Sequence, residues 1–281
     1  MRTWAQTAEG LGFDHVVMIE HVLGVDPLAR PDFGDLFPAE SKRPPYVAGD
    51  EFHEPMVMMG FLAACTTTIE LATGVLVLPQ RQTALAAKQL AEVDVLSRGR
   101  TRLCVGVGWN PIEYEALGMD FSTRGARVEE QAELLRALWT EPVVSFDGRF
   151  DKVLGAGIAP RPVQQPIPIW FGGWAEPALR RAGRIGDGWY CAVDPSEAVL
   201  DAVLTVRCAA QQSGRDGAAI GIEGGIELRN GLDIEERIAA WESVGATHLS
   251  IDPMNCGLSP FEHVDMLDKL AKMLPLSDAR V

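Results

Sequence analysis

TALAAKQLAEVDVLSRGRTRLCVGVGWN, residues 83–110, decides the fold class of this 281-residue chain. Residues 83–96 have the apolar pattern of an amphipathic helix, and Ser97-Arg98-Gly99 then ends it. Residues 102–107 are a short apolar run, typical of a strand buried on both faces of a sheet. A helix that leads through a tight turn into such a strand is a repeating unit of α/β proteins.

The same alternation continues on both sides of this stretch. Strands are predicted over residues 13–19, 69–78, 102–107, 167–171, 188–193, 219–228 and 247–251. Helices are predicted over residues 2–9, 54–64, 83–96, 111–139 (interrupted near 118–122), 176–184, 196–212, 234–244 and 260–274. Strands that alternate with helices imply a parallel sheet covered by helices, and the single domain expected over residues 1–281 is a (β/α)₈ TIM barrel.

Seven strands are predicted, one fewer than a closed barrel of this kind needs. The chain opens on a helix, so we expect a barrel that lacks its first β-strand, which we attribute to an incomplete N-terminus. Residues 13–19 and 247–251 are expected to flank the gap; if the chain were instead complete, they would have to pair with each other or be bridged by another segment. An open doubly wound sheet is the alternative, but no GxGxxG motif follows an early strand.

Two polar stretches rich in Pro and Gly, near residues 21–53 and 146–165, are predicted to be irregular insertion loops. Loops of this length in compact domains are usually functional or disordered.

Composition excludes several classes of protein. The chain is 47% hydrophobic, its net charge is −14, and no cluster of Lys and Arg stands out, so nucleic acid is not expected as a partner. No apolar run approaches the roughly 20 residues of a membrane span, and no signal core follows Met1, so a cytoplasmic protein without membrane contact is expected. The five cysteines lack CxxC spacing and are expected to be reduced, mostly buried thiols.

Functional groups of a (β/α)₈ barrel gather at its mouth, where the carboxyl ends of the strands meet. His21 follows the strand at residues 13–19, and its imidazole could donate a hydrogen bond or a proton near neutral pH. A surface histidine without a role is the alternative interpretation.

Glycines interrupt or end two other strands. Gly74 lies within the run Thr73-Gly74-Val75 and indicates a bulge or the close approach of a ligand, or else tight packing of a helix on the sheet. In the sequence Gly106-Val107-Gly108-Trp109-Asn110, glycines without side chains stand beside one large aromatic ring, an arrangement that suits the binding of a planar ring system. Trp109 could instead be a packing residue.

Gly172-Gly173-Trp174 joins a predicted strand to a helix. Exposed N–H groups in a glycine turn at a helix N-terminus form an anion site, commonly for phosphate, although many such turns use glycine for geometry alone. No metal-binding pair of histidines or cysteines, GxSxG elbow or P-loop is present, so the chemistry is expected to fall to a bound organic cofactor.

Taken together, these motifs resemble luciferase-like monooxygenases and their F420-dependent relatives. The resemblance covers residues from about 5 to 190 and rests on AEGLGFD (8–14), EHV (20–22), LATGV (71–75), KQLA (88–91), LSRGR (96–100), GVGWN (106–110), EALG (115–118), RGAR (124–127), PRPVQ (160–164), PIWFGG (168–173) and GDGW (186–189).

The resemblance implies an oxidoreductase that transfers a hydride between a cofactor ring at the barrel mouth and a small organic substrate. His21 matches the family histidine near the ring, and Gly74–Val75 matches a cis peptide behind it. The cofactor-binding residues expected are Thr73, Gly74, Val75, Gly106, Gly108, Trp109, Asn110, Gly172, Gly173 and Trp174, with the last three near the cofactor phosphate.

The GWN and RGAR pattern favours coenzyme F420 as the cofactor, and FMN, in a monooxygenase, is the alternative. A third possibility is a non-catalytic cofactor-binding paralogue. Two positions depart from the family: Glu20 stands where an Asp is common, and Trp109 stands where the sugar-phosphate dehydrogenases carry an acidic residue. The resemblance also implies a homodimer.

Overall fold

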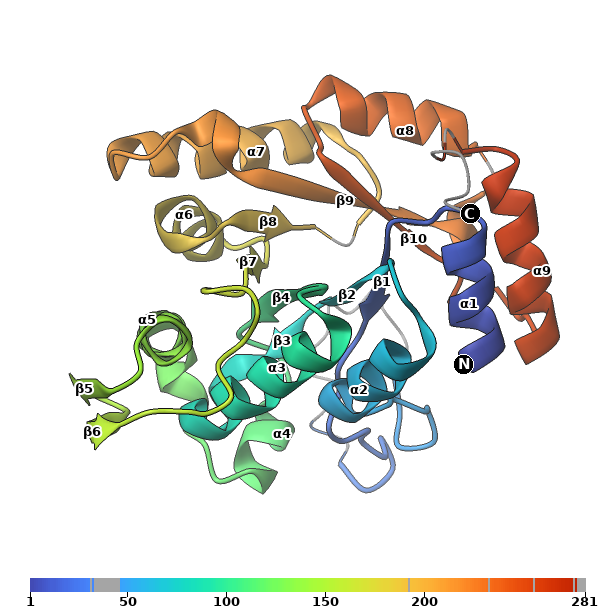
Figure 1. The fold of residues 1–281 in the computed structure, drawn as a ribbon. Helices are drawn as coiled ribbons and strands as arrows, with labels where there is room; N and C mark the ends of the chain where they lie inside the picture. Colours follow the sequence, from blue (N-terminus) through green and yellow to red (C-terminus); the bar gives the residue numbers. More distant parts are fainter. Residues whose placement is uncertain are drawn as a thin grey trace.

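The computed structural model describes residues 1–30, 32, 46–191, 193–231, 233–254, 256–274 and 276. Its centre is an eight-stranded parallel sheet in the order β1-β2-β4-β7-β8-β9-β10, with β3 beside β4. The strands are β1 (His15–Met18), β2 (Glu70–Thr73), β3 (Leu76–Val77), β4 (Thr101–Gly106), β7 (Ile169–Gly172), β8 (Gly188–Tyr190), β9 (Gly221–Glu227) and β10 (His248–Asp252). The sheet curves into a nearly closed barrel, as the sequence predicts (Figure 1).

Helices cover the outside of the sheet (Figure 1). They are α1 (Arg2–Gly10), α2 (Pro55–Cys65), α3 (Thr83–Ser97), α4 (Pro111–Ala116), α5 (Arg124–Thr140), α6 (Glu176–Ile185), α7 (Glu197–Gln212), α8 (Ile234–Ser243) and α9 (Pro260–Ala271). The predicted helix over 111–139 is two helices, α4 and α5, because Gly118 adopts the left-handed φ of 68° between them.

The core lies between the sheet and these helices. Strand β4 is buried along its whole length, as expected for a strand with helices outside and side chains packed within the barrel. Trp139 of α5 is fully buried, and its Nε1–H donates to the carbonyl of Ala87 on α3 at 3.0 Å. This bond satisfies the polar atom of a large apolar side chain and fixes α5 against α3.

A buried ion-pair network fills the interior of the barrel below the mouth. Arg102 of β4 donates to Glu223 of β9 and to Glu70 of β2 at 2.5 Å. His15 Nε2 lies 3.0 Å from Glu223 Oε1, and Ser250 also donates to this carboxylate. Burial raises the pKa of Glu223, but the hydrogen bond from His15 and the charge of Arg102 outweigh that effect and hold it at about 2.

The sheet is open between β1 and β10. These two strands end the sheet order, and no ladder joins them in the part of the chain that the structure describes. They are the strands that the sequence predicts to flank the gap, and among those residues they neither pair with each other nor are bridged by another strand.

Gly74 and Val75 interrupt the predicted strand over 69–78. The strand is therefore two strands, β2 and β3, and the Gly74–Val75 peptide bond is cis, which confirms the expectation from the resemblance.

The prediction of an irregular loop over residues 146–165 is partly wrong. Its first part forms an antiparallel hairpin with β5 (Val144–Asp147) and β6 (Lys152–Ala156). The carboxylate of Glu130 on α5 accepts hydrogen bonds from the backbone N–H groups of Arg149, Phe150 and Asp151, at 2.7–2.8 Å. A side chain from the middle of the preceding helix thus stabilises the turn, and no local sequence pattern predicts this contact.

The other predicted insertion, 21–53, has no α-helix or strand in its described residues, and positions 31 and 33–45 lie outside them. All five cysteines are free, but only Cys104 and Cys191 are buried, so the expectation of mostly buried thiols is wrong. The others sit on helices or in the loop before α9, where part of the surface faces solvent.

Candidate functional site

Glycines at two strand ends make room for the side chain of Val75. A Cβ placed on Gly106 would lie 2.5 Å from Val75 Cγ2, and one on Gly172 would lie 2.7 Å from Val75 Cγ1. A Cβ on Gly74 would instead lie against Cγ1 of Val17 and 2.6 Å from the hydroxyl of Tyr190. Real Cβ atoms do not approach this closely, so only glycine fits at these three positions.

His21 lies on the other side of the mouth within a group of aromatic rings. Its ring stacks on Tyr46 with the centroids 3.8 Å apart, and the rings of Phe52 and Trp109 lie 5.0 and 5.8 Å away. Trp109 is 36% exposed, so one face of this group is open to solvent and to a ligand.

Glu113, in the first turn of α4, holds the loop that carries His21. Its Oε1 accepts from the N–H groups of Val22 at 2.7 Å and Leu23 at 3.2 Å, and it lies 3.5 Å from His21 Nδ1. Burial raises the pKa of Glu113, but the hydrogen bonds, led by that from His21, lower it below its ordinary value. The carboxylate is therefore charged, and it favours a proton on Nδ1 of His21.

Asn110 acts with Glu113 from the N-cap of α4. Its Oδ1 accepts from the N–H of Ile112 at 3.0 Å, and its Nδ2 donates to the hydroxyl of Tyr46 at 3.0 Å. Because the cap and the first turn of one helix hold both Tyr46 and His21, the stacked pair has a fixed position.

A second buried carboxylate lies next to this group and connects two loops at the mouth. Glu20, directly before His21, accepts from the N–H of Val77 at 2.7 Å and from the guanidinium of Arg81. Arg81 also donates to Glu54, the N-cap of α2, at 2.9 Å. The loops after β1 and β3 are thus joined by a paired, hydrogen-bonded carboxylate.

The turn after β7 joins the barrel mouth to helix α6. Gly173 has a φ of 122°, its carbonyl accepts from Trp189 Nε1 at 3.0 Å, and the ring of Trp174 lies 5.4 Å from that of Trp189. Helix α6 then starts at Glu176, and no side-chain hydrogen bond caps it. Its first turn carries the carboxylate of Glu176, which lies at the positive end of the helix dipole, and Pro177, which has no N–H to donate.

The candidate residues fall into groups. His21, Trp109 and Asn110 meet around Tyr46, and Gly74, Gly106 and Gly172 meet around Val75. Gly108 packs on Val77 and the ring of Tyr114.

Thr73 lies apart from both groups. It is fully buried, its hydroxyl donates to the carbonyl of Cys104 at 2.7 Å, and it accepts from the N–H of Cys104 at 3.0 Å. Its side chain holds β2 to β4.

Three residues of this arrangement were not candidates in the sequence: Tyr46, Phe52 and Glu113. Glu113 had one local signal, since an acid three residues after an Asn cap lies on the first turn of a helix at the mouth. Tyr46 and Phe52 had none, because they belong to a long loop whose position depends on tertiary contacts.

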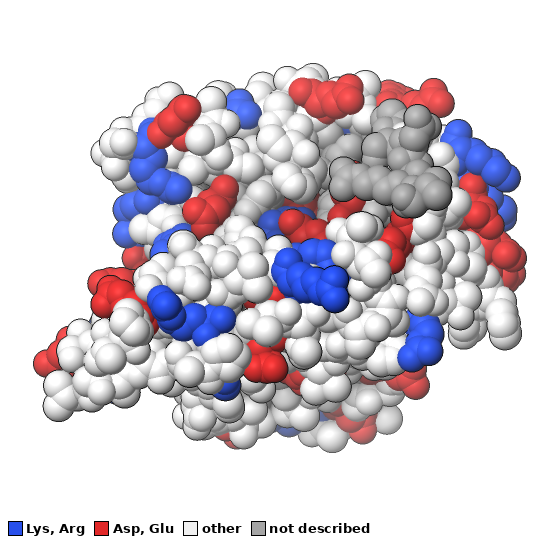
Figure 2. Space-filling view, viewed as in Figure 1, with Lys and Arg blue, Asp and Glu red and all other residues white. Residues whose placement is uncertain are grey.

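Charged side chains are mixed on the visible surface. On the face shown in Figure 2, Lys and Arg alternate with Asp and Glu and form no single patch of one sign. Within the described residues, no helix is long and apolar enough to cross a membrane, and no group of three or more His, Cys, Asp or Glu side chains could hold a metal ion.

Residues 1–229 match the luciferase-like monooxygenase family, and the chain belongs to that family. It is 36% identical over 201 residues to an uncharacterized protein of Mycobacterium tuberculosis, a match that covers 69% of this chain and 65% of that protein. It is also 28% identical over 239 residues to the F420-dependent glucose-6-phosphate dehydrogenase of Segniliparus rotundus, covering 83% of this chain and 64% of the dehydrogenase. The chain thus spans slightly less than two thirds of each of these relatives.

The monooxygenase RslO1 from Streptomyces bottropensis has a similar fold, with a TM-score of 0.74 over 97% of this chain and 92% of that one. At 22% sequence identity, this likeness establishes the barrel fold alone. The relatives of the chain within this family include an F420-dependent dehydrogenase.

Proposed function

We propose that this protein is an F420-dependent oxidoreductase, which transfers a hydride between the deazaflavin ring and a small organic molecule. The observation that carries the proposal is the position of His21. Glu113 and Tyr46 hold it beside Trp109, in the loop that follows β1.

The residues at the mouth fit a planar, anionic cofactor. Gly106 and Gly172 have no side chains, so Val75 is the side chain that lies between these strand ends. This arrangement suits the close approach of a flat ring. The turn at Gly172-Gly173, before α6, is proposed to lie near its phosphate group. These residues, with Trp109, are proposed to hold the cofactor.

Arginines near the start of α5 support an anionic ligand with more than one negative group. The Nε atoms of Arg124 and Arg127 are buried without a hydrogen-bond partner, while other nitrogens of the two guanidinium groups donate to the carbonyls of Phe121 and Arg81. In a chain with a net charge of −14, these two cations are the feature of this region that would attract an anion. The F420-dependent relative and the RGAR segment at 124–127 favour F420 over FMN.

When bound, the deazaflavin supplies a carbon centre that accepts or releases a hydride. The protein binds and orients both reactants, and His21 donates a hydrogen bond or a proton to the substrate or the ring. Glu113, whose carboxylate lies 3.5 Å from His21 Nδ1, is proposed to position the imidazole for this role.

The test is a titration of the purified protein with F420 and, separately, with reduced FMN, followed by tryptophan fluorescence. F420 is expected to bind in the micromolar range and at least tenfold more tightly than FMN. Trp109→Leu and His21→Ala should each weaken F420 binding about tenfold, which corresponds to the roughly 1.4 kcal/mol of one lost contact.

His263→Ala, which removes a histidine from α9, is the matched control and should bind F420 as the unmodified protein does. Tighter binding of FMN would overturn the choice of cofactor and favour a flavin-dependent monooxygenase. Binding of neither cofactor would overturn the proposal and favour a non-catalytic protein.

A further inference from the structure

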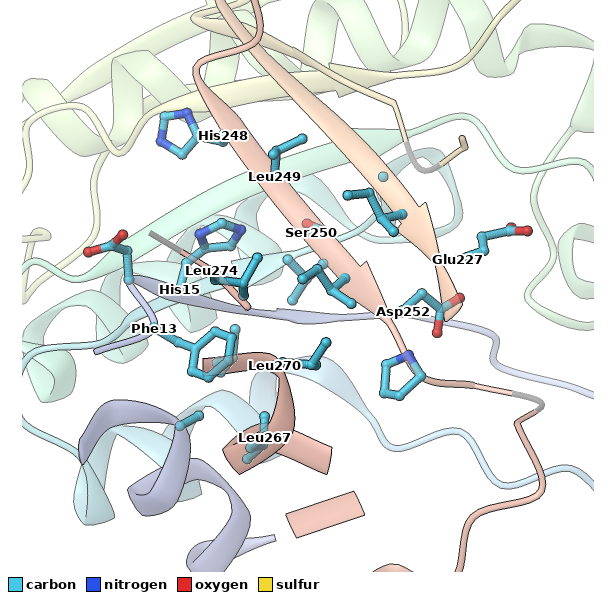
Figure 3. A pocket seen from close by; sticks show the side chains of 18 of the residues that line it. Phe13, His15, Glu227, His248, Leu249, Ser250, Asp252, Leu267, Leu270 and Leu274 are labelled. Carbon is cyan, nitrogen blue, oxygen red and sulfur yellow. The ribbon is translucent and has the colours of Figure 1, made fainter. Parts of the chain in front are cut away.

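A buried amide lies behind the carboxylate that contacts His21. Gln80 ends the short 3₁₀-helix η2 (Leu78–Gln80), directly after β3, and the residue is only 4% exposed. Its Nε2 donates to Oε2 of Glu113 at 3.3 Å. A cavity of about 680 Å³ lies between β1 and β10 and is also lined by residues of α1 and α9 (Figure 3). None of Gln80, Glu113 and His21 lines it, so their contacts are independent of that space.

We propose that Gln80 is a positioning residue for His21: its amide fixes the plane of the Glu113 carboxylate and keeps that carboxylate charged, and the carboxylate in turn orients the imidazole and its proton. The inference deepens the proposed function. It rests on that proposal in one respect, namely that His21 is the group that acts on the reactants.

The two oxygens of Glu113 have different partners. Oε1 accepts from the N–H groups of Val22 and Leu23 and lies 3.5 Å from His21 Nδ1. Oε2 accepts from Gln80, its one hydrogen-bond partner in the described part of the chain. The last torsion of a glutamate side chain is broad, so bonds to one oxygen do not fix the plane of the carboxylate. The bond from Gln80 to the other oxygen does, and it thereby sets how Oε1 faces the imidazole.

Adjacent residues serve the two buried acids beside His21 in different ways. Glu20 pairs with the guanidinium of Arg81, whereas Glu113 receives a neutral amide from Gln80. The cation compensates the charge of Glu20, but an amide donates a hydrogen bond without adding a charge. The charge of Glu113 is therefore left to act on His21.

Hydrogen bonds favour the charged form of Glu113. Burial raises the pKa of this carboxyl, and the bonds from His21, from the N–H of Leu23 and from Gln80 lower it below its ordinary value. Gln80 thus contributes to the charge as well as to the orientation of the group that faces the imidazole.

The backbone on both sides of Gln80 is held in place, so its amide is a fixed donor. Nε2 of Gln131, a fully buried side chain of α5, donates to the carbonyls of Leu78 at 3.2 Å and Arg81 at 3.1 Å. The 3₁₀-helix cannot shift without breaking these bonds to α5. The position of its last side chain is therefore set by the body of the barrel.

The other end of the amide indicates why a polar side chain is present at this position. Oε1 of Gln80 is buried and has no hydrogen-bond partner among the described residues. An unpaired buried oxygen costs stability, and leucine or methionine would fill a similar volume without that cost. What the amide adds is the bond from Nε2 to Glu113, which indicates a role in the site rather than in packing.

The first measurement needs no ligand. Gln80→Leu removes the donor, and Gln80→Met removes it while keeping an unbranched side chain. In long-range proton–nitrogen NMR spectra of protein with isotope-labelled histidine, the signals of His21, identified by their loss in His21→Ala, report which ring nitrogen carries the proton. We expect the ratio of the Nδ1–H form to the Nε2–H form to fall at least about threefold in both variants, which is less than the full effect of one hydrogen bond because it acts through Glu113.

The second measurement is a double-mutant cycle on F420 affinity. Gln80→Leu should weaken F420 binding about threefold to fivefold when His21 is present. In the His21→Ala background the group that Gln80 positions is gone, so the same change should weaken binding by less than about 1.5-fold. A residue that only stabilises the fold would give the same factor in both backgrounds.

Gln82→Leu is the matched control. Gln82 lies two positions further along the chain, is exposed, and makes no side-chain hydrogen bond at the start of α3. Its replacement should change neither the tautomer ratio of His21 nor the affinity for F420.

An unchanged tautomer ratio in either folded variant of Gln80 would overturn the proposal, and so would equal factors in the two backgrounds of the cycle. A shift of the same size in Gln82→Leu would also overturn it, because the effect would then not depend on the bond to Glu113. Failure of the unmodified protein to bind F420 would count against the proposed function alone, and the tautomer ratio would still decide the role of Gln80.

Discussion

Of the substitutions that test this structure, replacement of the buried Glu223 is expected to cost the most stability for the smallest change in side-chain shape. It is fully buried and pairs with Arg102, His15 and Ser250 inside the barrel. Glu223→Gln keeps the volume of the side chain but removes the negative charge, so Arg102 keeps only Glu70, which is 34% exposed, as a charged partner.

The magnitude follows from the pKa of Glu223, which the folded protein lowers from 4.5 to about 2. One pKa unit corresponds to about 1.4 kcal/mol, so the charged form contributes about 3 kcal/mol to folding near neutral pH. This agrees with the roughly 3–5 kcal/mol that breaking a buried ion pair costs. For a chain of this size, the loss lowers the melting temperature by about 6–12 °C.

Urea unfolding followed by tryptophan fluorescence, at several pH values, measures this difference. Because the pKa is lowered in the folded state, the contribution of Glu223 is complete above pH 4.5 and is lost as the pH falls toward about 2. The difference in free energy of unfolding between the unmodified protein and Glu223→Gln should therefore shrink across that range.

Glu227→Gln, four positions along the same strand, removes a partly exposed carboxylate that pairs with Arg229 and serves as the control, with an expected cost below about 1 kcal/mol. A Glu223→Gln protein within 1 kcal/mol of the unmodified one at pH 7 would refute the reasoning. So would a difference that stays constant between pH 5 and pH 2.5.

Two further changes test the packing of the mouth and the cap of the last helix. Gly106→Ala places a Cβ against Val75 and is expected to cost about 1–3 kcal/mol in urea unfolding; adding Val75→Ala should restore at least half of that loss, and no restoration would show that the clash lies elsewhere. Ser259→Ala removes the capping box of α9, in which the Ser259 side chain and Glu262 exchange hydrogen bonds with the backbone, at a cost of about 0.5–2 kcal/mol. Ser196→Ala, at a helix start without a side-chain cap bond, should change the stability little by comparison, and equal losses in the two variants would contradict the assignment.

The parallel barrel could be predicted because its signal is local. The spacing of apolar side chains over about ten residues is enough to predict a helix or a strand. The alternation of helices and strands then restricts the fold class to a parallel sheet covered by helices. The glycines at positions 74, 106 and 172 were found in the same way, since a glycine in a buried strand marks close approach of another group, whereas the cis bond at Gly74–Val75 was expected from the family resemblance.

The contacts of His21 could not be predicted from its own surroundings. Its partners Tyr46 and Glu113 lie 25 and 92 positions further along the chain, and a long loop brings the first of them into place. The hairpin of β5 and β6 was missed for a related reason, because the carboxylate that organises its turn belongs to Glu130 on a helix.

By itself, the sequence determined the order of helices and strands, the parallel sheet, the two strands at its ends and the positions where only glycine fits. The tertiary structure decided which mouth residues meet, the ion-pair network around Glu223 and the cavity between β1 and β10. The physical reason is the distance along the chain between the residues that interact. Apolar periodicity and glycine geometry involve a few neighbouring residues. Burial, charge pairing and a free sheet edge depend on segments that only the folded chain brings together.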